Sequence, residues 1–217
     1  DLVDNINQQG VHLTGVDGEH WIPAKASTTS SDFFPTDIAF IHTDTNNSAA
    51  AAIQANAVLD KQDGWCITFQ NGIGNVEKLQ HELGIERVAG GISYHSAVSP
   101  EPGQSFHTNA GKTWIGELDR QPSERVDALQ TTLSNAGFDV QIADDIVAII
   151  WSKFVLNCAV NPICAITGFR TGEIGTHTAA TELQKGILDE VLEVVDARGI
   201  SLVGQDPRAT VEGLTDR

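Results

Sequence analysis

The most informative hydrophobic pattern is an apolar run that begins near Ile146 and is interrupted by polar residues at regular spacing. Lys153, Asn157 and Asn161 stand four residues apart in this run. On an α-helix, four residues turn the side chain about 40° past a full circle, so the three polar groups share one slanting stripe. The pattern therefore predicts a helix that is apolar over most of its surface and polar along one line.

This stripe suits a small polar substrate that carries a carbonyl and a carboxylate, because an ammonium flanked by two carboxamides can bind both groups. A structural reading stays open beside it. Lysine side chains often reach from an apolar helix face to water, and buried asparagines often satisfy neighbouring backbone groups. Pro162 lacks an amide hydrogen and disfavours helical geometry at Asn161, so we expect a kink or a helix end there.

Ahead of this helix, the pattern alternates between strands and helices. We expect a β-hairpin from Val11 to Pro23, with its turn at Asp17-Gly18. Strands are expected at Asp37–His42 (buried), Trp65–Gln70, Arg87–Ser93 and Phe138–Ile142, antiparallel strands within Gly103–Glu117, and helices at Asn47–Leu59, within Gly72–Leu83 after a turn, and at Ser123–Ala136. Such alternation implies a parallel sheet with right-handed crossovers.

After Asp144 the pattern becomes helical. Helices are expected at Asp145–Val160, in a short piece that ends at Thr167, and at Thr178–Arg198 with Gly199 as its stop. We therefore predict an α/β fold with a Rossmann-like parallel sheet over residues 1–143, followed by an all-α domain over residues 144–217. The first would be part of a dinucleotide-binding domain and the second part of a substrate and catalytic domain.

A dinucleotide-binding sheet normally opens with a Gly-x-Gly-x-x-Gly turn that seats the pyrophosphate on a helix N-terminus. The nearest match, Gly72-Ile-Gly74-Asn-Val-Glu77, carries a carboxylate in the third glycine position, where it would repel a phosphate. We therefore expect the phosphate-binding turn, and the first β-α-β portion of the sheet, to precede Asp1. The absence of methionine and the aspartate start also suggest that the sequence is not an intact translation product.

Composition narrows the function classes. With 41% hydrophobic and 19% charged residues, the 217-residue chain is typical of a soluble globular protein. The net charge of −16 argues against nucleic acid or an anionic membrane as a partner. The longest apolar run is too short to span a bilayer, and no signal peptide is visible. Three cysteines without metal-ligand spacing favour a reducing cytoplasm and no metal site.

Three segments together resemble the ketopantoate reductase (2-dehydropantoate 2-reductase) family. They are Gln70-Asn71-Gly72-Ile-Gly74 after a strand, Ile115-Gly-Glu117, and Trp151-Ser-Lys153…Asn157…Asn161-Pro162…Ala165-Ile-Thr167-Gly168. The resemblance covers essentially the whole chain. It implies an NADPH-dependent enzyme of pantothenate biosynthesis, with NADH left open as coenzyme, that reduces a 2-keto acid to the D-2-hydroxy acid. A homodimer is left open as well.

By position, the resemblance also implies roles for individual residues. Lys153 matches the family's proton donor to the ketone oxygen, and Asn157 and Asn161 match its substrate-binding amides. Asn71 matches an asparagine near the nicotinamide and the substrate. The remaining two matches are Ala97, where the backbone meets the cofactor, and Thr171, a further substrate contact.

One departure and two alternatives stand beside this assignment. The family usually has a lysine in the loop after the first of these parallel strands, but here the loop reads His42-Thr-Asp-Thr-Asn-Asn47, with no basic residue nearby. That leaves the preference for NADPH open. The alternatives are a lyase that uses Lys153 as a Schiff-base amine, and a non-catalytic nucleotide-binding module on the same scaffold.

Overall fold

The structure, a computed structural model, describes residues 1–204 and 206–215 of the chain. Contacts between Cα atoms divide the chain into two compact units. The first holds Asp1–Gln70 and Gly74–Ile146, and the second holds Asn71–Ile73 and the chain from Val147 onward. The division after Ile146 lies close to residue 143, where the hydrophobic pattern changes.

The first unit is built on a five-stranded sheet. Its strands are β3 (Ile38–Ile41), β4 (Trp65–Thr68), β5 (Val88–Ser93), β8 (Thr113–Glu117) and β9 (Val140–Ile142), in the order β3-β4-β5-β8-β9. The first three are parallel, β8 is antiparallel to β5, and β9 is parallel to β8. The predicted α/β class with a parallel sheet is therefore confirmed.

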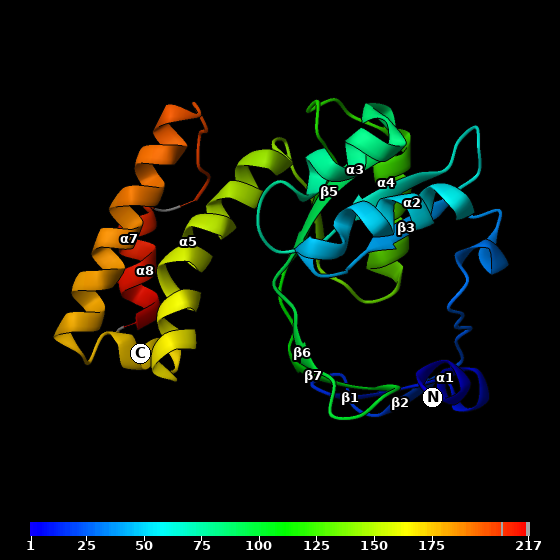
Figure 1. Cartoon of the computed structure of the whole chain (residues 1–217), viewed down its shortest axis with the longest axis horizontal. Coiled ribbons are helices and arrows are strands. Elements are labelled where there is room, and N and C mark those ends of the chain that lie inside the picture. Colours follow the sequence, from blue (N-terminus) through cyan, green and yellow to red (C-terminus); the bar gives the residue numbers. More distant parts are fainter. Residues whose placement is uncertain (205, 216–217) are drawn as a thin grey trace. The chain divides into compact units, whose positions relative to one another are not determined.

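Helices cover both faces of this sheet (Figure 1). Helices α2 (Ser48–Val58) and α3 (Asn75–Leu83) pack on one face, where Cys66 of β4 belongs to the core. Helix α4 (Glu124–Asn135) packs on the other face, where Ile67, the next residue of β4, belongs to the core. Successive strand residues point to opposite faces, so a strand buried on both sides is apolar throughout.

Strand β3 departs from its prediction as a buried strand. Only Ile41 of its four residues is buried, and Phe40 is 44% exposed. The reason is its place in the described sheet, where β3 stands at one end of the strand order and pairs with β4 alone. An end strand has fewer neighbours to cover its side chains.

A second sheet of four strands belongs to the same unit. Its members are β1 (Val11–Gly15), β2 (His20–Ile22), β6 (Ser96–Val98) and β7 (Gln104–Asn109), in the order β2-β1-β7-β6. The predicted hairpin is confirmed, since β1 and β2 are antiparallel. The strands expected within Gly103–Glu117 both form, but they do not pair with each other, because β7 joins β1 and β6 whereas β8 joins β5 and β9.

A short N-terminal helix and 3-10 turns complete the first unit, and the second unit is helical. Helix α1 (Leu2–Gln9) and the 3-10 turns η1 (Ser30–Phe33), η2 (Thr45–Asn47) and η3 (Ile85–Arg87) belong to the first unit. The other helices are α5 (Ile146–Thr167), α6 (Thr171–Ile174), α7 (Thr178–Ala197) and α8 (Pro207–Thr215). Helix α7 ends as predicted at Gly199, whose φ of 65° is a left-handed conformation that glycine adopts readily. The sequence pattern gave no indication of α8.

Helix α5 corrects one expectation outright. It continues through Pro162 to Thr167 as a single helix of 22 residues, so the predicted end at Asn161 is wrong. Proline inside a helix costs about 3 kcal/mol. That cost is offset here because Val160 and Ile163, on either side of it, are buried in a cluster with residues of α6 and α7. This length also corrects the expectation that the apolar run is too short to span a bilayer: by length and composition alone α5 could cross a membrane, with a mean hydropathy of 1.6 over its most apolar stretch.

Three titratable side chains from separate segments meet in the first unit. Nδ1 of His107, in β7, is hydrogen-bonded to the carboxylate of Asp17, in the hairpin turn. Nε2 of His107 lies 2.9 Å from Nδ1 of His95, which follows β5. Among the described residues, the buried Nε2 of His95 has no hydrogen-bond partner. A proton added to the two rings must therefore reside on a nitrogen that has no acceptor.

Burial, reinforced by the neighbouring His107 and opposed by Asp17, lowers the pKa of His95 below its ordinary value. The unfolded chain then binds this proton more tightly than the folded chain. We therefore expect the free energy of unfolding to be highest above a pH of about 6.5 and to decrease as the pH falls through the ordinary histidine range. Thermal unfolding between pH 7.5 and 5 measures this decrease.

Replacing the His95 imidazole tests whether this side chain causes the decrease in the free energy of unfolding. In His95→Phe the decrease should be smaller, whereas in His81→Gln, which alters an exposed histidine of α3, it should match the parent. An unchanged pH dependence in His95→Phe would show that another group is responsible.

Candidate active site

Helix α5 has two contrasting faces. Trp151, Val155 and Ala159 form a buried ridge that packs against Leu188 and Val195 of α7, with Val211 of α8 in the same cluster (Figure 1). Lys153, Asn157 and Asn161 begin two residues further along the chain. Two residues turn about 200° around a helix, so the polar stripe lies on the face opposite the ridge.

Exposure increases along the stripe. Lys153 and Asn157 are half-buried, and Asn161 is exposed. Burial lowers the pKa of the Lys153 ammonium below its ordinary value, because a desolvated amine holds its proton less tightly. The proton of this amine is therefore easier to transfer than that of a surface lysine.

The turn that carries Asn71 belongs to the same unit as this helix. Asn71 is exposed and follows β4, and Ile73 packs against the hydrophobic cluster that contains Trp151. Gly72 and Gly74 have φ angles of 89° and 83°, which glycine adopts without strain. The structure thus assigns the Asn71 turn and the Lys153 helix to one compact unit.

The other two predicted residues have different surroundings. Thr171 is half-buried and is the first residue of α6, whose Ile174 is buried with Val160 and Ile163 of α5. Ala97 is exposed in β6, in the four-stranded sheet of the first unit, and pairs with His107. The roles of both residues stay predictions.

The loop after β3 does have a basic neighbour, contrary to the expectation from sequence. Lys78, in the first turns of α3, donates a hydrogen bond from Nζ to the carbonyl of Thr45 at 3.2 Å. The two residues are 33 positions apart, so a search of the loop alone missed the contact. A cation therefore lies beside this loop at the carboxyl edge of the parallel strands, the edge at which doubly wound sheets bind their ligands.

The glycine turn after β4, at the same edge of the sheet, has room for a nicotinamide coenzyme. Above Gly72 and Gly74, an added Cβ atom would meet no other atom within 4 Å, so the turn presents open backbone. Open glycine backbone after a parallel strand suits the close approach of a flat ligand. The pyrophosphate fingerprint is not part of this turn, because Glu77 occupies the third glycine position.

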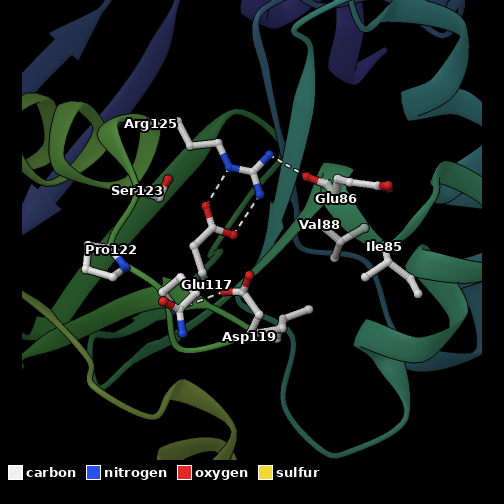
Figure 2. A pocket seen from close by; sticks show the side chains of 10 residues that line it. Ile85, Glu86, Val88, Glu117, Asp119, Pro122, Ser123 and Arg125 are labelled. Carbon is white, nitrogen blue, oxygen red and sulfur yellow. Dashed lines mark hydrogen bonds and ion pairs between the residues drawn. The ribbon is translucent and has the colours of Figure 1, made fainter.

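A surface hollow lies at the amino end of β5, away from the carboxyl ends of the parallel strands (Figure 2). Arg125 of α4 binds both carboxylate oxygens of Glu117, at 2.6 and 2.7 Å, and donates to the carbonyl of Glu86 at 2.6 Å. Its guanidinium also lies 4.8 Å from the ring centroid of Trp65. Arg125 and Glu117 neutralise each other in this hollow, so we interpret their ion pair as a structural clamp.

Two family models match this chain, one for each of its two parts. The family model described as ketopantoate reductase PanE/ApbA matches residues 1–120, and that of its C-terminal domain matches residues 145–217. The chain belongs to the ketopantoate reductase family. This places both units within one known architecture and agrees with the resemblance carried by the Asn71 and Lys153 segments.

Individual members of the family show how much of the chain is shared. A 2-dehydropantoate 2-reductase from Pyrococcus horikoshii is 30% identical over 198 residues, which are 91% of this chain and 64% of the relative. The crystal structure of 2-dehydropantoate 2-reductase from Geobacter metallireducens superposes with a TM-score of 0.87 at 25% identity, covering 97% of this chain and 70% of that one. D-mandelate dehydrogenase, with a TM-score of 0.89 at 20% identity over 99% of this chain and 69% of that one, shares the fold. The chain thus spans somewhat less than two thirds of the Pyrococcus relative.

The ion pair between Arg125 and Glu117 (Figure 2) leads to a prediction about the free energy of unfolding. Replacing Arg125 by alanine leaves the Glu117 carboxylate, only 11% exposed, without its partner. A buried charge that loses its partner costs about 3 kcal/mol, so Arg125→Ala should lower the free energy of unfolding by roughly that amount. Urea unfolding measures the change. The control is Arg208→Ala, which breaks an exposed ion pair with Asp189 and should have a much smaller effect; equal effects would rule out the clamp.

Proposed function

We propose that this protein reduces a small branched 2-keto acid, 2-dehydropantoate or a close analogue, to the D-2-hydroxy acid with NADPH or NADH. The observation that carries the proposal is the half-buried Lys153, with its lowered pKa, on a stripe with two carboxamides. Membership of the ketopantoate reductase family supports it. So do the relatives named 2-dehydropantoate 2-reductase.

The chemistry assigns each side chain one task. A bound nicotinamide coenzyme would supply the hydride. Negative charge then develops on the ketone oxygen, and the Lys153 ammonium stabilises that charge by a hydrogen bond and donates its proton from Nζ to the oxygen. The neutral amine regains a proton from water. Asn157 and Asn161 hold the substrate, with Thr171 as a further contact, so that the carbonyl faces the amine.

The coenzyme contacts in this proposal come from the first unit and the turn after β4. Asn71 would hold the nicotinamide end together with the backbone near Ala97. The resemblance implies NADPH, and NADH stays open because D-mandelate dehydrogenase, which shares the fold, has been solved with NADH and anilino(oxo)acetate. Lys78 beside the loop at Thr45 is a cation that could favour a further phosphate.

Removing the amine is the direct test. Lys153→Met keeps the length and apolar stem of the side chain, and we expect kcat for keto-acid reduction to fall by about 10²- to 10⁴-fold, as for loss of a general acid. Lys185→Met, in α7 and exposed, is the matched control and should keep its activity. Steady-state rates of NADPH and NADH oxidation give both numbers. Equal activity of the two variants would remove Lys153 from the mechanism.

The pH profile gives a second, independent reading of Lys153. Because burial lowers its pKa, the proton needed for donation is lost at a lower pH than for an ordinary lysine, whose pKa is about 10.4. We expect kcat/KM to be level at neutral pH and to decrease as the pH rises through this lowered pKa. A profile that stays level up to pH 10 would contradict the assignment.

Borohydride trapping separates reduction from the lyase alternative. A Schiff base between Lys153 and a keto acid would be fixed as a covalent adduct visible by mass spectrometry, whereas hydride transfer leaves none. Fluorescence titration with NADPH and NADH, for which Trp151 is a reporter on the same helix, addresses the binding-module alternative. A protein that binds a coenzyme but reduces no 2-keto acid would favour the module.

A further inference from the structure

Gln70, the residue between β4 and Asn71, has every polar atom of its side chain engaged. It is 8% exposed. Its Nε2 donates to the carbonyl of Thr43 at 2.6 Å and to Oγ of Ser48 at 2.9 Å, and its Oε1 accepts from the hydroxyl of Thr68 at 3.0 Å. A buried carboxamide with all its hydrogen bonds made is held in one orientation.

The network continues from Ser48 to the start of the next helix. Oγ of Ser48, the first residue of α2, lies 2.9 Å from Oδ1 of Asn75, the first residue of α3. The same oxygen lies 3.0 Å from the carbonyl of Thr45. Ser48 and Asn75 are 0% and 2% exposed, so these contacts are shielded from bulk water. Gln70, Ser48 and Asn75, which we call the amide network, thus join the loop after β3 to both ends of the turn at residues 71–74.

The two ends of this turn are anchored by the amide network. Helix α3 begins after Gly74 without a side-chain hydrogen bond to cap it. Gly72 and Gly74 contribute no side chain that could pack. Ser48 contacts residue 70 at one end of the turn and residue 75 at the other, and Ile73 between them packs against the cluster that contains Trp151, so this hydroxyl helps to set where Asn71 lies.

We propose that Gln70 is a positioning residue of the reductase, acting through the amide network. It holds the loop of residues 42–47 and the turn of residues 71–74 in one arrangement, so that Asn71 and the open backbone at Gly72 meet the nicotinamide end of the coenzyme. This inference rests on the proposed function. Gln70 is buried and its amide is engaged by protein groups, so in this proposal it acts by fixing the groups that meet the coenzyme.

Two substitutions break the network from different elements. Gln70→Leu keeps the volume of the side chain and removes its amide, and Ser48→Ala removes the hydroxyl between the two ends of the turn. A misplacement of about 1 Å in a reacting group can lower a rate about 100-fold, so kcat/KM should fall by up to that factor in each variant. The dissociation constants of NADPH and NADH, measured by fluorescence titration, should rise together with it.

The control is Gln130→Leu. Gln130 of α4 is also partly buried and donates to a backbone carbonyl, that of Val140, but lies outside the amide network. It should lose stability without a change in coenzyme affinity. If Gln70→Leu does not fold, Gln70→Glu, which keeps the oxygen that accepts from Thr68 and loses the two donors, takes its place.

The double variant of Gln70→Leu and Ser48→Ala makes the comparison quantitative. If the two residues act as one network, the double variant should lose about as much coenzyme affinity as either single variant, because the arrangement is already lost. Losses that multiply would mean two independent effects and would overturn the network.

The outcomes separate this inference from the proposed function. A parent protein that neither binds a coenzyme nor reduces a 2-keto acid overturns both. A parent that does both, with network variants that lose only melting temperature as Gln130→Leu does, overturns the positioning role and leaves the reductase intact. Weaker coenzyme binding and slower reduction in the network variants, at temperatures where each is folded, support it.

Discussion

The structure depends on a conflict within α5, which must bury an apolar ridge while holding an ammonium partly out of water. Trp151, Val155 and Ala159 fix the rotation of the helix by packing against α7 and α8. At roughly 25 cal/mol per Å² of buried apolar surface, such a ridge supplies several kcal/mol. That packing leaves Lys153 no choice of face, and its half-buried position and lowered pKa follow from it.

Local periodicity explains why so much of the architecture could be predicted. Strand–helix alternation from β3 to β5 and the cap at Ser123, whose Oγ accepts from the amide of Val126, are features of neighbouring residues. The polar stripe on α5 is also local, since a helix of known pitch fixes which residues share a face. Neither needs information from distant parts of the chain.

Long-range contacts explain what the sequence could not reveal. Strands β7 and β8 follow one another along the chain, yet β7 joins the four-stranded sheet and β8 the five-stranded one. The helix passes Pro162 because of a cluster that includes Ile174, twelve residues away. Likewise Gln70 finds Ser48 across 22 residues, and no motif marks a hydrogen bond between two such ordinary side chains.

The amide network bears on how an acidic protein could hold an anionic coenzyme. A chain with a net charge of −16 repels an anionic coenzyme, so local donors must hold it against the overall field. Charged donors are few at this edge, and the backbone of a glycine turn is a donor only while the turn keeps its position. Rigid anchoring by buried uncharged groups supplies that position without adding charge. The fully bonded Gln70 beside Asn71 is an anchor of this uncharged kind.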